Sequence, residues 1–509
     1  MSQVCLASVD IGTESARAAL LTPQGKVLAS ASRQYGMACP RPGWAEQDPE
    51  SWWEATVQNL RDCRAQAPEA EVAAVCVAGQ MHATVAIDGE GRLVSHAALL
   101  WCDKRSAGFC DRVAAEGAKA GLDLTAFTGN TPLAAWTGFK LRWLKENQPE
   151  VYRGAATFLS CSGYLNYRLT GARASDYSEA SGSFLFDAGR REWSPELCAL
   201  LALDQAKLPE IRESAEVIGT VTREAAAATG LTPGTPVVCG GGDMMLILLG
   251  AGIASFGQAC DVTGTAADVS VFTPRPLANP RLMHLHHVVP GGGWIAFGIL
   301  DAGGGSLKWF RDTFAAAEVA EARRRGVSPY EVLSSLAEET PPGAEGLFYL
   351  PYLLGERTLG SATSRGVFFG LTPRHTTGHC VRAIMEGVTY DLRQTLDLIA
   401  AERVAIGEIR AIAGGAKSPL WCQIKADVYR RPVVTLKNFE GGVVGGAILA
   451  GLGVGLYGSV AEAAWQVVEL DRKFIPDAEE ARRYEARHRF FKRLHDGFQE
   501  YFGELAGLE

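Results

Sequence analysis

A polar turn between two short apolar runs, at residues 4–21, carries the first group of side chains that could do chemistry. Its small and polar residues are Asp10, Gly12, Thr13 and Ser15. The flanking residues suit β-strands, so the segment predicts a β-hairpin with these groups at its tip. Backbone N–H and hydroxyl groups there can donate to phosphate oxygens, while a carboxylate holds Mg²⁺, often through water. The pattern indicates a polyphosphate site, although Asp10 could instead bond its own turn.

A second hairpin of the same kind is predicted at residues 258–272, about half a chain further on. Gly264 and Thr265 stand at the equivalent tip. Two similar hairpins at this separation indicate an internal duplication. We therefore expect two lobes that face one nucleotide.

Asp243 follows three glycines at the end of an apolar strand predicted at 235–243. Glycines let backbone and ligand approach closely, so this carboxylate is displayed where a general base could act. On local evidence alone, it could equally cap the following helix. Its position between the two phosphate-type hairpins favours the catalytic interpretation.

Two further predicted strands end in polar side chains. Met81 and His82 follow the strand at 72–80, and Trp101 and Asp103 follow the next one. Open α/β sheets bind ligands at the carboxyl ends of their strands. A flat indole beside an imidazole and a carboxylate suits a polyol, because the ring covers C–H groups and the polar atoms meet hydroxyls. Any one of these residues alone is more often a core or surface residue.

Two other patterns carry less information. The Gly-Gly-Ala turn at 414–416 precedes a predicted helix and could admit adenine against the backbone, although one glycine turn is weak evidence. His284, His286 and His287 resemble a metal-binding cluster, but no third ligand at a recognisable spacing accompanies His284 and His286 on their strand face. We expect packing and hydrogen bonding there. The Walker pattern is absent, which excludes a P-loop enzyme.

The composition narrows the class of protein. The formal net charge is −8 and no basic tract stands out, which argues against a nucleic-acid partner. The 12 cysteines include no Cys-x-x-Cys pair, which favours reduced thiols over a zinc ribbon or a disulfide framework. We recognise no targeting segment and expect a cytoplasmic protein. The uncharged, glycine-rich stretch at 441–461 predicts a buried helix rather than a membrane span.

Strand-like and helix-like runs alternate along the chain, which predicts an α/β fold. Helices are expected at 51–66, 221–230 and 477–508. The small and apolar residues at 243–257 form the predicted break between the lobes. We therefore expect an N-terminal lobe at residues 1–245, with the residues predicted for phosphate, Mg²⁺ and a polyol. A C-terminal lobe is expected at residues 246–509, with the second hairpin and the turn predicted for a nucleotide.

Several segments occur in the order seen in FGGY-type carbohydrate kinases, which the chain resembles over nearly its full length. Within that family it is most similar to the xylulokinases. The family's two sequence patterns are approximated around 140–147 and at 366–386. The first has one mismatch, at Ala135 shortly before residue 140, and the second has one mismatch, at Cys380. The matching segments are DIGTESARAALL (10–21), GQMH (79–82), LLWCDKR (99–105), GGGD (240–243), the Gly264-Thr265 hairpin, PYLLGERT (351–358), GVFFGLTPR (366–374) and AGGAKSPLWCQIKADVYRRPV (413–433).

The resemblance implies two ribonuclease H-like lobes of the actin, hexokinase and Hsp70 type, with ATP and sugar in the cleft between them. It implies that Asp10 serves the Mg²⁺ ion and that Asp243 is the catalytic base. It assigns the sugar to Met81, His82, Trp101, Asp103 and Asp243. It assigns the phosphates and the nucleotide to Gly12, Thr13, Ser15, Arg17, Gly264, Thr265, Gly414, Gly415 and Ala416. A homodimer without a membrane partner is expected at the level of the family.

The reaction implied is ATP-dependent transfer of the γ-phosphate to the terminal hydroxyl of a ketopentose, first of all D-xylulose to D-xylulose 5-phosphate. Departures from the xylulokinase pattern at Cys102, Ala266-Ala267, Leu359 and Gly360 leave the sugar less fixed than the reaction. Another ketose, a polyol or a small signalling sugar is the alternative within this class. An ATP-driven conformational switch or a sugar-sensing pseudokinase is the alternative of another class, and Asp243 with the sugar set favours the enzyme.

Overall fold

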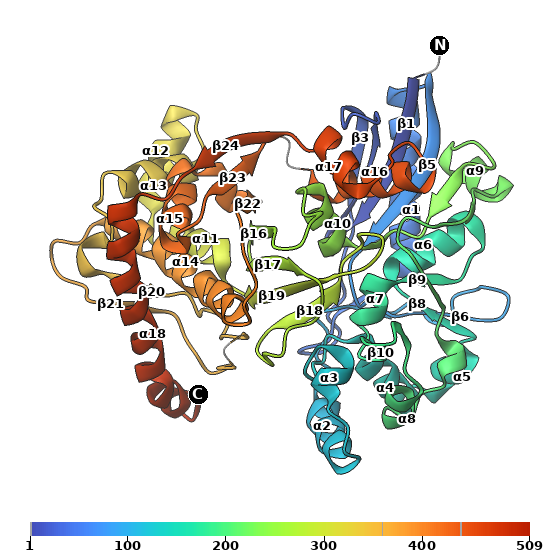
Figure 1. The fold of residues 1–509 in the computed structure, drawn as a ribbon, viewed down its shortest axis with the longest axis horizontal. Coiled ribbons are helices and arrows are strands. Elements are labelled where there is room, and N and C mark those ends of the chain that lie inside the picture. The colour runs from blue at the N-terminus through green and yellow to red at the C-terminus, as the bar shows by residue number, and fades with distance from the viewer. Residues whose placement is uncertain (1–2, 359, 438–439, 509) are drawn as a thin grey trace.

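The computed structural model describes residues 3–358, 360–437 and 440–508, and two mixed β-sheets form its framework (Figure 1). The first sheet contains β1 Gln3–Ile11, β2 Ser15–Leu21, β3 Val27–Gln34, β5 Ala70–Gly79, β13 Val217–Thr220, β14 Pro236–Val238 and β15 Gly241–Gly242. Its strand order is β13-β14-β5-β1-β2-β3, and β15 pairs with β5. β1 pairs antiparallel with β2 and parallel with β5.

The second sheet repeats this arrangement. It contains β16 Ala259–Thr263, β17 Ala267–Thr273, β18 Met283–His286, β19 Trp294–Leu300, β22 Ile409–Ile412, β23 Val433–Leu436 and β24 Leu470–Phe474, in the order β18-β19-β17-β16-β22-β23-β24. β16 pairs antiparallel with β17 and parallel with β22, as β1 does with β2 and β5. Both predicted hairpins and the α/β class with two ribonuclease H-like lobes are confirmed.

Helices pack around both sheets. They are α1 Pro49–Gln66, α6 Cys161–Thr170, α9 Arg223–Thr229, α10 Asp243–Gly250, α11 Gly303–Phe314, α12 Ala316–Arg325, α13 Pro329–Glu338, α14 Thr377–Ala401, α15 Pro419–Tyr429, α16 Gly441–Gly453, α17 Val460–Val467 and α18 Ala478–Ala506. Asp48, Ser418 and Asp477 accept N-terminal backbone N–H groups of α1, α15 and α18, which explains where these helices begin. The predicted helices at 51–66, 221–230 and 477–508 are confirmed.

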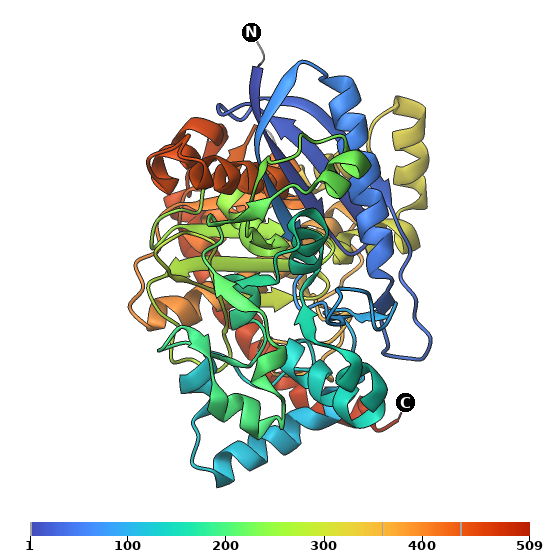
Figure 2. The same cartoon turned by 90° about the vertical axis from the view of Figure 1, so that its right-hand side faces the viewer.

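Shorter elements fill the long connections. They are β4 Glu46–Gln47, β6 Val85–Ile87, β7 Ala98–Leu99, α2 Cys110–Lys119, α3 Leu124–Thr128, α4 Thr137–Asn147, α5 Pro149–Gly154, β8 Thr157–Leu159, β9 Ala174–Asp176, α7 Tyr177–Ser181, β10 Phe186–Asp187, β11 Glu192–Trp193, α8 Pro195–Leu200, β12 Glu210–Arg212, β20 Phe348–Leu350 and β21 Val367–Phe369. Figure 2 shows the cyan and teal helices of this group below the blue sheet.

β1 is buried on both faces, and its side chains alternate between two cores. Cys5, Ala7 and Val9 belong to the cluster that includes the tryptophans of α1. Leu6 belongs to the other cluster, which includes the apolar residues of α16. Because alternate side chains share a face, Asp10 points to the α16 side of the sheet.

The glycine-rich stretch predicted as a buried helix forms α16, and this prediction is confirmed. α16 packs closely against α10: a Cβ atom at Gly445 would lie 2.0 Å from the Leu246 carbonyl oxygen, and one at Gly250 would lie 1.9 Å from that of Gly441. Only glycines permit such backbone contact. Among the described residues, none of the helices combines the length and the apolar composition needed to cross a bilayer.

The division into lobes at 245 and 246 stays a prediction, and the structure adds one feature to it. α16 follows β23 of the second sheet in sequence but packs against β1 and β5 of the first. The first sheet is therefore completed by a segment from the far end of the chain. Leu359, one of the positions at which the sequence departs from the xylulokinase pattern, lies outside the described residues.

Candidate active site

The carboxyl ends of three neighbouring strands bring the two candidate acidic residues together. Ile11 at the end of β1 pairs with Gly79 of β5, which in turn pairs with Gly242 of β15. Asp10 lies one residue before this row and Asp243 one residue after it. Neighbouring strands stand about 4.8 Å apart, so the two backbones are separated by roughly 10 Å and their side chains can face the same space.

Asp243 is the first residue of α10 and is partly buried. Its Oδ1 accepts the backbone N–H of Met244 at 2.8 Å. Burial, with a further contribution from the charge of Asp10, raises the pKa of Asp243 to about 7. Such a carboxyl group can accept a proton near neutral pH, which suits a general base.

Asp10 is also partly buried, and burial raises its pKa to about 6 against the opposing effect of the Arg17 charge. It faces the N-terminus of α16 so closely that a Cβ atom at Gly442 would lie 2.1 Å from its Oδ2. Arg17, opposite Asp10 on β2, donates to Glu440 at 2.5 Å. This ion pair ties the first hairpin to the start of α16, and the predicted phosphate contact of Arg17 stays a prediction.

The residues around Asp10 suit Mg²⁺. This ion typically takes one or two carboxylates and completes its octahedron with water and substrate phosphates. Asp10 supplies a hard oxygen donor, and its charge contributes to the raised pKa of Asp243, so the two carboxyl groups are near enough to interact. Glycine at position 442 leaves the space beside the Asp10 carboxylate free of a side chain. The described residues hold no cluster of three acidic, histidine or cysteine side chains that could bind a metal.

Hydrogen bonds from the protein hold the backbone at the tip of the first hairpin. The Gly12 N–H donates to the Ser15 carbonyl oxygen at 3.0 Å, and Tyr35 donates its hydroxyl to the Gly12 carbonyl oxygen. The Gln47 amide donates to the Thr13 carbonyl oxygen at 2.6 Å. The expected tight turn does not explain the glycine, because Gly12 is outside the left-handed region and a Cβ atom there would meet only an ordinary contact at 3.5 Å.

The tip of the second hairpin rests on α11. The N–H groups of Gly304 and Gly305 donate to the carbonyl oxygens of Gly264 and Thr265 at 2.8 and 2.9 Å. Gly304 has no room for a side chain, since its Cβ would lie 2.5 Å from the Gly264 oxygen. Gly264 itself is open, with its nearest contact at 3.6 Å. Packing within the protein therefore requires glycine at position 304, beneath the tip, but not at position 264, at the tip itself.

A buried ion pair lies beneath the second hairpin. Lys425 of α15 donates to Asp261 at 2.5 Å and to the Thr263 hydroxyl at 2.7 Å, and Tyr429 donates to the other Asp261 oxygen at 2.7 Å. Both charged side chains are fully buried. This network joins β16 to the helix that follows the turn at 414–416.

The turn at 414–416 begins with a strained residue. Ala413 has φ 65° and ψ −158°, a region that residues other than glycine rarely occupy. Gly415 packs against Thr263 with no room for a Cβ, whereas Gly414 is exposed and open. Gly414, Gly415 and Ala416 lie beside the second hairpin, and their contact with a nucleotide stays a prediction.

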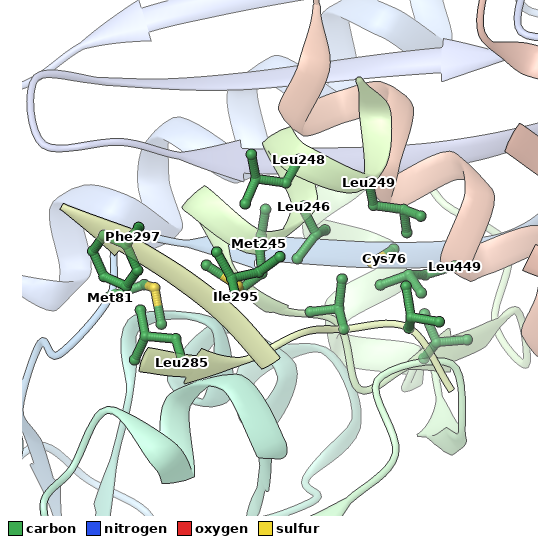
Figure 3. Close-up of a cluster of buried hydrophobic side chains, with 14 of the residues drawn as sticks. Cys76, Met81, Met245, Leu246, Leu248, Leu249, Leu285, Ile295, Phe297 and Leu449 are labelled. Carbon is green, nitrogen blue, oxygen red and sulfur yellow. The ribbon is translucent and has the colours of Figure 1, made fainter. Parts of the chain in front are cut away.

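The predicted sugar residues Met81 and His82 lie after β5, and Trp101 and Asp103 lie after β7. His82 lies three residues after the end of β5 and has a left-handed φ of 61°. Burial lowers the pKa of its imidazole to about 3, so the ring is neutral. Figure 3 shows Met81 with Leu285 and Phe297 in the apolar cluster between the sheets, and Gly242 packs against its side chain. The Met81 side chain therefore contributes to the core directly beside Asp243.

Trp101 is 41% exposed, and its indole N–H donates to the Thr13 hydroxyl at 3.0 Å, so it reaches the tip of the first hairpin. Asp103 is buried, and its carboxylate already has partners within the protein. The Arg105 Nη2 atom lies 2.8 Å from Oδ2, and the Ala45 N–H donates to the same oxygen at 2.7 Å. Arg105 in turn stacks over Trp44, 3.6 Å from the ring centre. Sugar contacts by Trp101 and Asp103 stay predictions.

The three histidines of β18 and the residue after it form structural hydrogen bonds. His284, His286 and His287 pair through a ring nitrogen with the carbonyl oxygens of Gly129, His287 and Ile253. Burial lowers each pKa to about 4. The expectation of packing and hydrogen bonding is confirmed.

Several residues of this region escaped the sequence analysis. Gln47 and Tyr35 hold the first hairpin, Lys425 supports the second, and Lys140 and Glu179 contact the backbone of His82. None belongs to a motif with a local chemical reading, although Lys140 and Lys425 lie in segments that carry the family resemblance. The physical signal was a polar residue inside a predicted helix, such as Lys425 within α15.

Comparison with known families identifies the class of protein. The model for the N-terminal domain of the FGGY family of carbohydrate kinases matches residues 5–250, and that for the C-terminal domain matches residues 261–454. The chain belongs to the FGGY family of carbohydrate kinases, and it is a phosphotransferase that acts on a sugar hydroxyl.

Individual relatives are similar along nearly the whole chain. The chain is 32% identical to the xylulose kinase of Bacillus subtilis (strain 168) over 491 residues, 96% of each chain. It is 28% identical to the gluconokinase of Bacillus licheniformis over 510 residues, 98% of this chain and 97% of that one. The crystal structure of xylulose kinase from Rhodospirillum rubrum superposes with a TM-score of 0.89 at 32% identity, covering 98% of this chain and 100% of that one.

Proposed function

We propose that the protein transfers the γ-phosphate of ATP to the terminal hydroxyl of a ketopentose, with D-xylulose as the preferred sugar. The observation that carries the proposal is the pair of partly buried carboxylates at one sheet edge, Asp10 and Asp243, of which the second has its pKa raised to about 7. Phosphoryl transfer needs positioning, charge neutralisation and a carboxylate to take the hydroxyl proton.

In the proposed reaction Asp243 accepts the proton of the sugar's terminal hydroxyl. The hydroxyl oxygen forms a bond to the γ-phosphorus while the bond from that phosphorus to the β,γ-bridging oxygen breaks, and ADP leaves with the electron pair. Asp10 would hold Mg²⁺, which supplies charge neutralisation at the phosphates. The neutral, buried His82 donates to or accepts from sugar hydroxyls without a charge of its own.

The open glycines support a nucleotide at the two hairpins. Gly12, Gly264 and Gly414 have no protein contact closer than 3.5 Å at the position of a Cβ atom. Glycine at positions where the fold itself leaves room is explained by close approach of a ligand to the backbone. N–H and hydroxyl groups at such tips suit phosphate oxygens.

The xylulose kinases among the relatives support D-xylulose, and the gluconokinase at similar identity marks the main competitor. Cys102 and Gly360 place a thiol and a bare backbone where the xylulokinase pattern has polar or larger side chains. If they border the sugar, they remove hydrogen-bond partners and relax selectivity.

A coupled ADP-release assay tests the proposal. The panel contains D-xylulose, L-xylulose, D-ribulose, L-ribulose, glycerol and gluconate, each with ATP and Mg²⁺. We expect the highest kcat/KM with D-xylulose and ATP turnover stimulated by sugar. A clear preference for another compound would overturn the sugar but leave the kinase, whereas ATP turnover indifferent to all six would favour a conformational switch.

A further inference from the structure

The backbone of His82 is held in an unfavourable conformation by two buried side chains. Its φ of 61° lies in the left-handed region, where a residue with a Cβ atom is strained. The His82 N–H donates to Oε2 of Glu179 at 3.1 Å, and the His82 carbonyl oxygen accepts from Nζ of Lys140 at 2.8 Å. Both polar groups of this one residue are thus fixed from inside the protein.

The two side chains come from different elements and are deeply buried. Glu179 lies in α7 and is 4% exposed, and Lys140 lies in α4 and is 0% exposed. Lys140 donates a second hydrogen bond to the Ala135 carbonyl oxygen at 2.8 Å. The second oxygen of Glu179 has no hydrogen-bond partner among the described residues.

The imidazole ring is fixed as firmly as the backbone. The Trp136 ring lies at 86° to it with the centres 5.0 Å apart. Gly182 packs so tightly against the other part of the ring that a Cβ atom would lie 2.2 Å from Cε1. The direction of the imidazole is therefore set jointly by the packing around the ring and by the conformation of the His82 backbone.

We propose that Glu179 and Lys140 are positioning residues for sugar recognition: they hold the His82 backbone in its left-handed conformation and so aim the imidazole at the sugar. The inference rests on the proposed function in one respect, the role of His82 at the sugar. Neither side chain is assigned a contact with the reacting groups, and both act through His82.

The chemistry of Glu179 and Lys140 indicates that they position His82 rather than stabilise the fold. Burying an ammonium and a carboxyl group costs desolvation free energy that apolar side chains of similar size would avoid. Burial, with the charges of Asp176 and Asp243, raises the pKa of Glu179 well above its usual range. Burial also lowers the pKa of Lys140 to about 7. What the pair supplies is a defined acceptor and a defined donor on either side of one residue.

Two conservative variants of Glu179 separate position from charge. Glu179→Gln keeps the reach and an oxygen acceptor but removes the acid, whereas Glu179→Asp keeps the acid but is one methylene too short for the His82 N–H. Positioning predicts a sugar KM within about threefold of wild type for Glu179→Gln and at least tenfold higher for Glu179→Asp, with the ATP KM within about twofold in both. The reverse order would overturn the proposal.

A double-mutant cycle tests whether Glu179 acts through His82. Glu179→Asp should raise the sugar KM strongly in the wild-type background but by less than about twofold in a His82→Ala background. Equal effects in the two backgrounds would overturn the proposal. The wild type is measured first, on the sugar panel above, so that failure of the proposed function is seen as absence of sugar turnover before any variant is compared.

Lys140→Met removes the donor at the His82 carbonyl oxygen and should also raise the sugar KM at least tenfold. Lys425→Met is the matched control, because Lys425 is equally buried but supports the second hairpin. It should change the ATP KM rather than the sugar KM. If Lys140→Met does not fold, the Glu179 pair still decides, and if both lysine variants change the same parameter, the proposed role of Lys140 is wrong.

Discussion

Replacing Asp243 by asparagine should lower turnover by about 10²–10⁴-fold and stabilise the fold at the same time. Burial and Asp10 raise the Asp243 pKa from 3.8 to about 7, and each unit corresponds to about 1.4 kcal/mol. Ionising this residue in the native state therefore costs at most roughly 4 kcal/mol. The side chain keeps some contact with solvent, so we expect about 1–3 kcal/mol from the substitution.

The sign of the pH dependence follows from the raised native pKa. A carboxyl group that holds its proton more tightly when folded contributes stability below the unfolded pKa and loses it as pH rises through the folded pKa. The variant's advantage should therefore be small near pH 4, grow up to about pH 7, and level off above it. Thermal denaturation of both proteins without nucleotide or Mg²⁺ between pH 4 and 8 measures this gap.

Turnover is measured on the same preparations. The asparagine amide cannot accept the hydroxyl proton, so kcat should fall by about 10²–10⁴-fold while ATP still binds. Asp268→Asn is the matched control, since burial raises the Asp268 pKa to about 7 and its oxygen bonds Ser270 in the second sheet. It should show a similar pH-dependent gain with turnover unaffected. A gap independent of pH, or Asp243→Asn activity within threefold of wild type, would refute the reasoning.

Three further predictions concern the nucleotide side. Asp10→Ala should raise the KM values for ATP and Mg²⁺ by more than tenfold and the sugar KM by less than threefold; equal changes would show that the two sites are not divided. Gly442→Ala should have the same kinetic signature, because the new Cβ would lie 2.1 Å from the Asp10 carboxylate, and Gly503→Ala, with open space around it, should leave kinetics unchanged. Ala413→Gly should stabilise the protein by about 1 kcal/mol, seen as a higher Tm, because glycine adopts that backbone conformation without strain; an unchanged or lower Tm would contradict this.

Features encoded locally could be predicted from the sequence. The hairpins at residues 4–21 and 258–272 follow from apolar alternation around a glycine turn, which is a property of adjacent residues. The start of α15 follows from Ser418 and Pro419 for the same reason. The sequence places Asp243 at the end of a strand, and in the structure it lies at the strand-to-helix junction, one residue after β15.

Features that depend on partners distant in the sequence could not be predicted from it. The Arg17 to Glu440 ion pair spans 423 positions, and the bond from His82 to Glu179 spans 97. No local spacing announces either contact. The occupation of Asp103 by Arg105 and Ala45 likewise depends on how the loop after β7 folds back on the segment before β4. A carboxylate two residues from an arginine reads the same in the sequence whether it meets that arginine or a sugar.

The packing of α10 and α16 bears on how the lobes could move. α10 carries Asp243 at its start, α16 faces Asp10 with its own start, and the two helices cross with glycine backbones in contact. At these glycines the two backbones touch with no side chain between them, so we expect both helices to stay with the first sheet. By contrast, Figure 3 shows apolar side chains of α10 and β19 near one another, among them Met245, Ile295 and Phe297, and hydrophobic contacts of this kind are non-directional.

Within the predicted break between the lobes at 243–257, we predict a hinge in the segment after α10. Gly252 and Gly257 both have left-handed φ angles and flank the short link that leads to β16. A hinge there would carry the second hairpin and the turn at 414–416 toward the first sheet while Asp10 and Asp243 kept their mutual geometry. Closure would then bring the nucleotide to a fixed pair of carboxylates, rather than assemble that pair anew in each catalytic cycle.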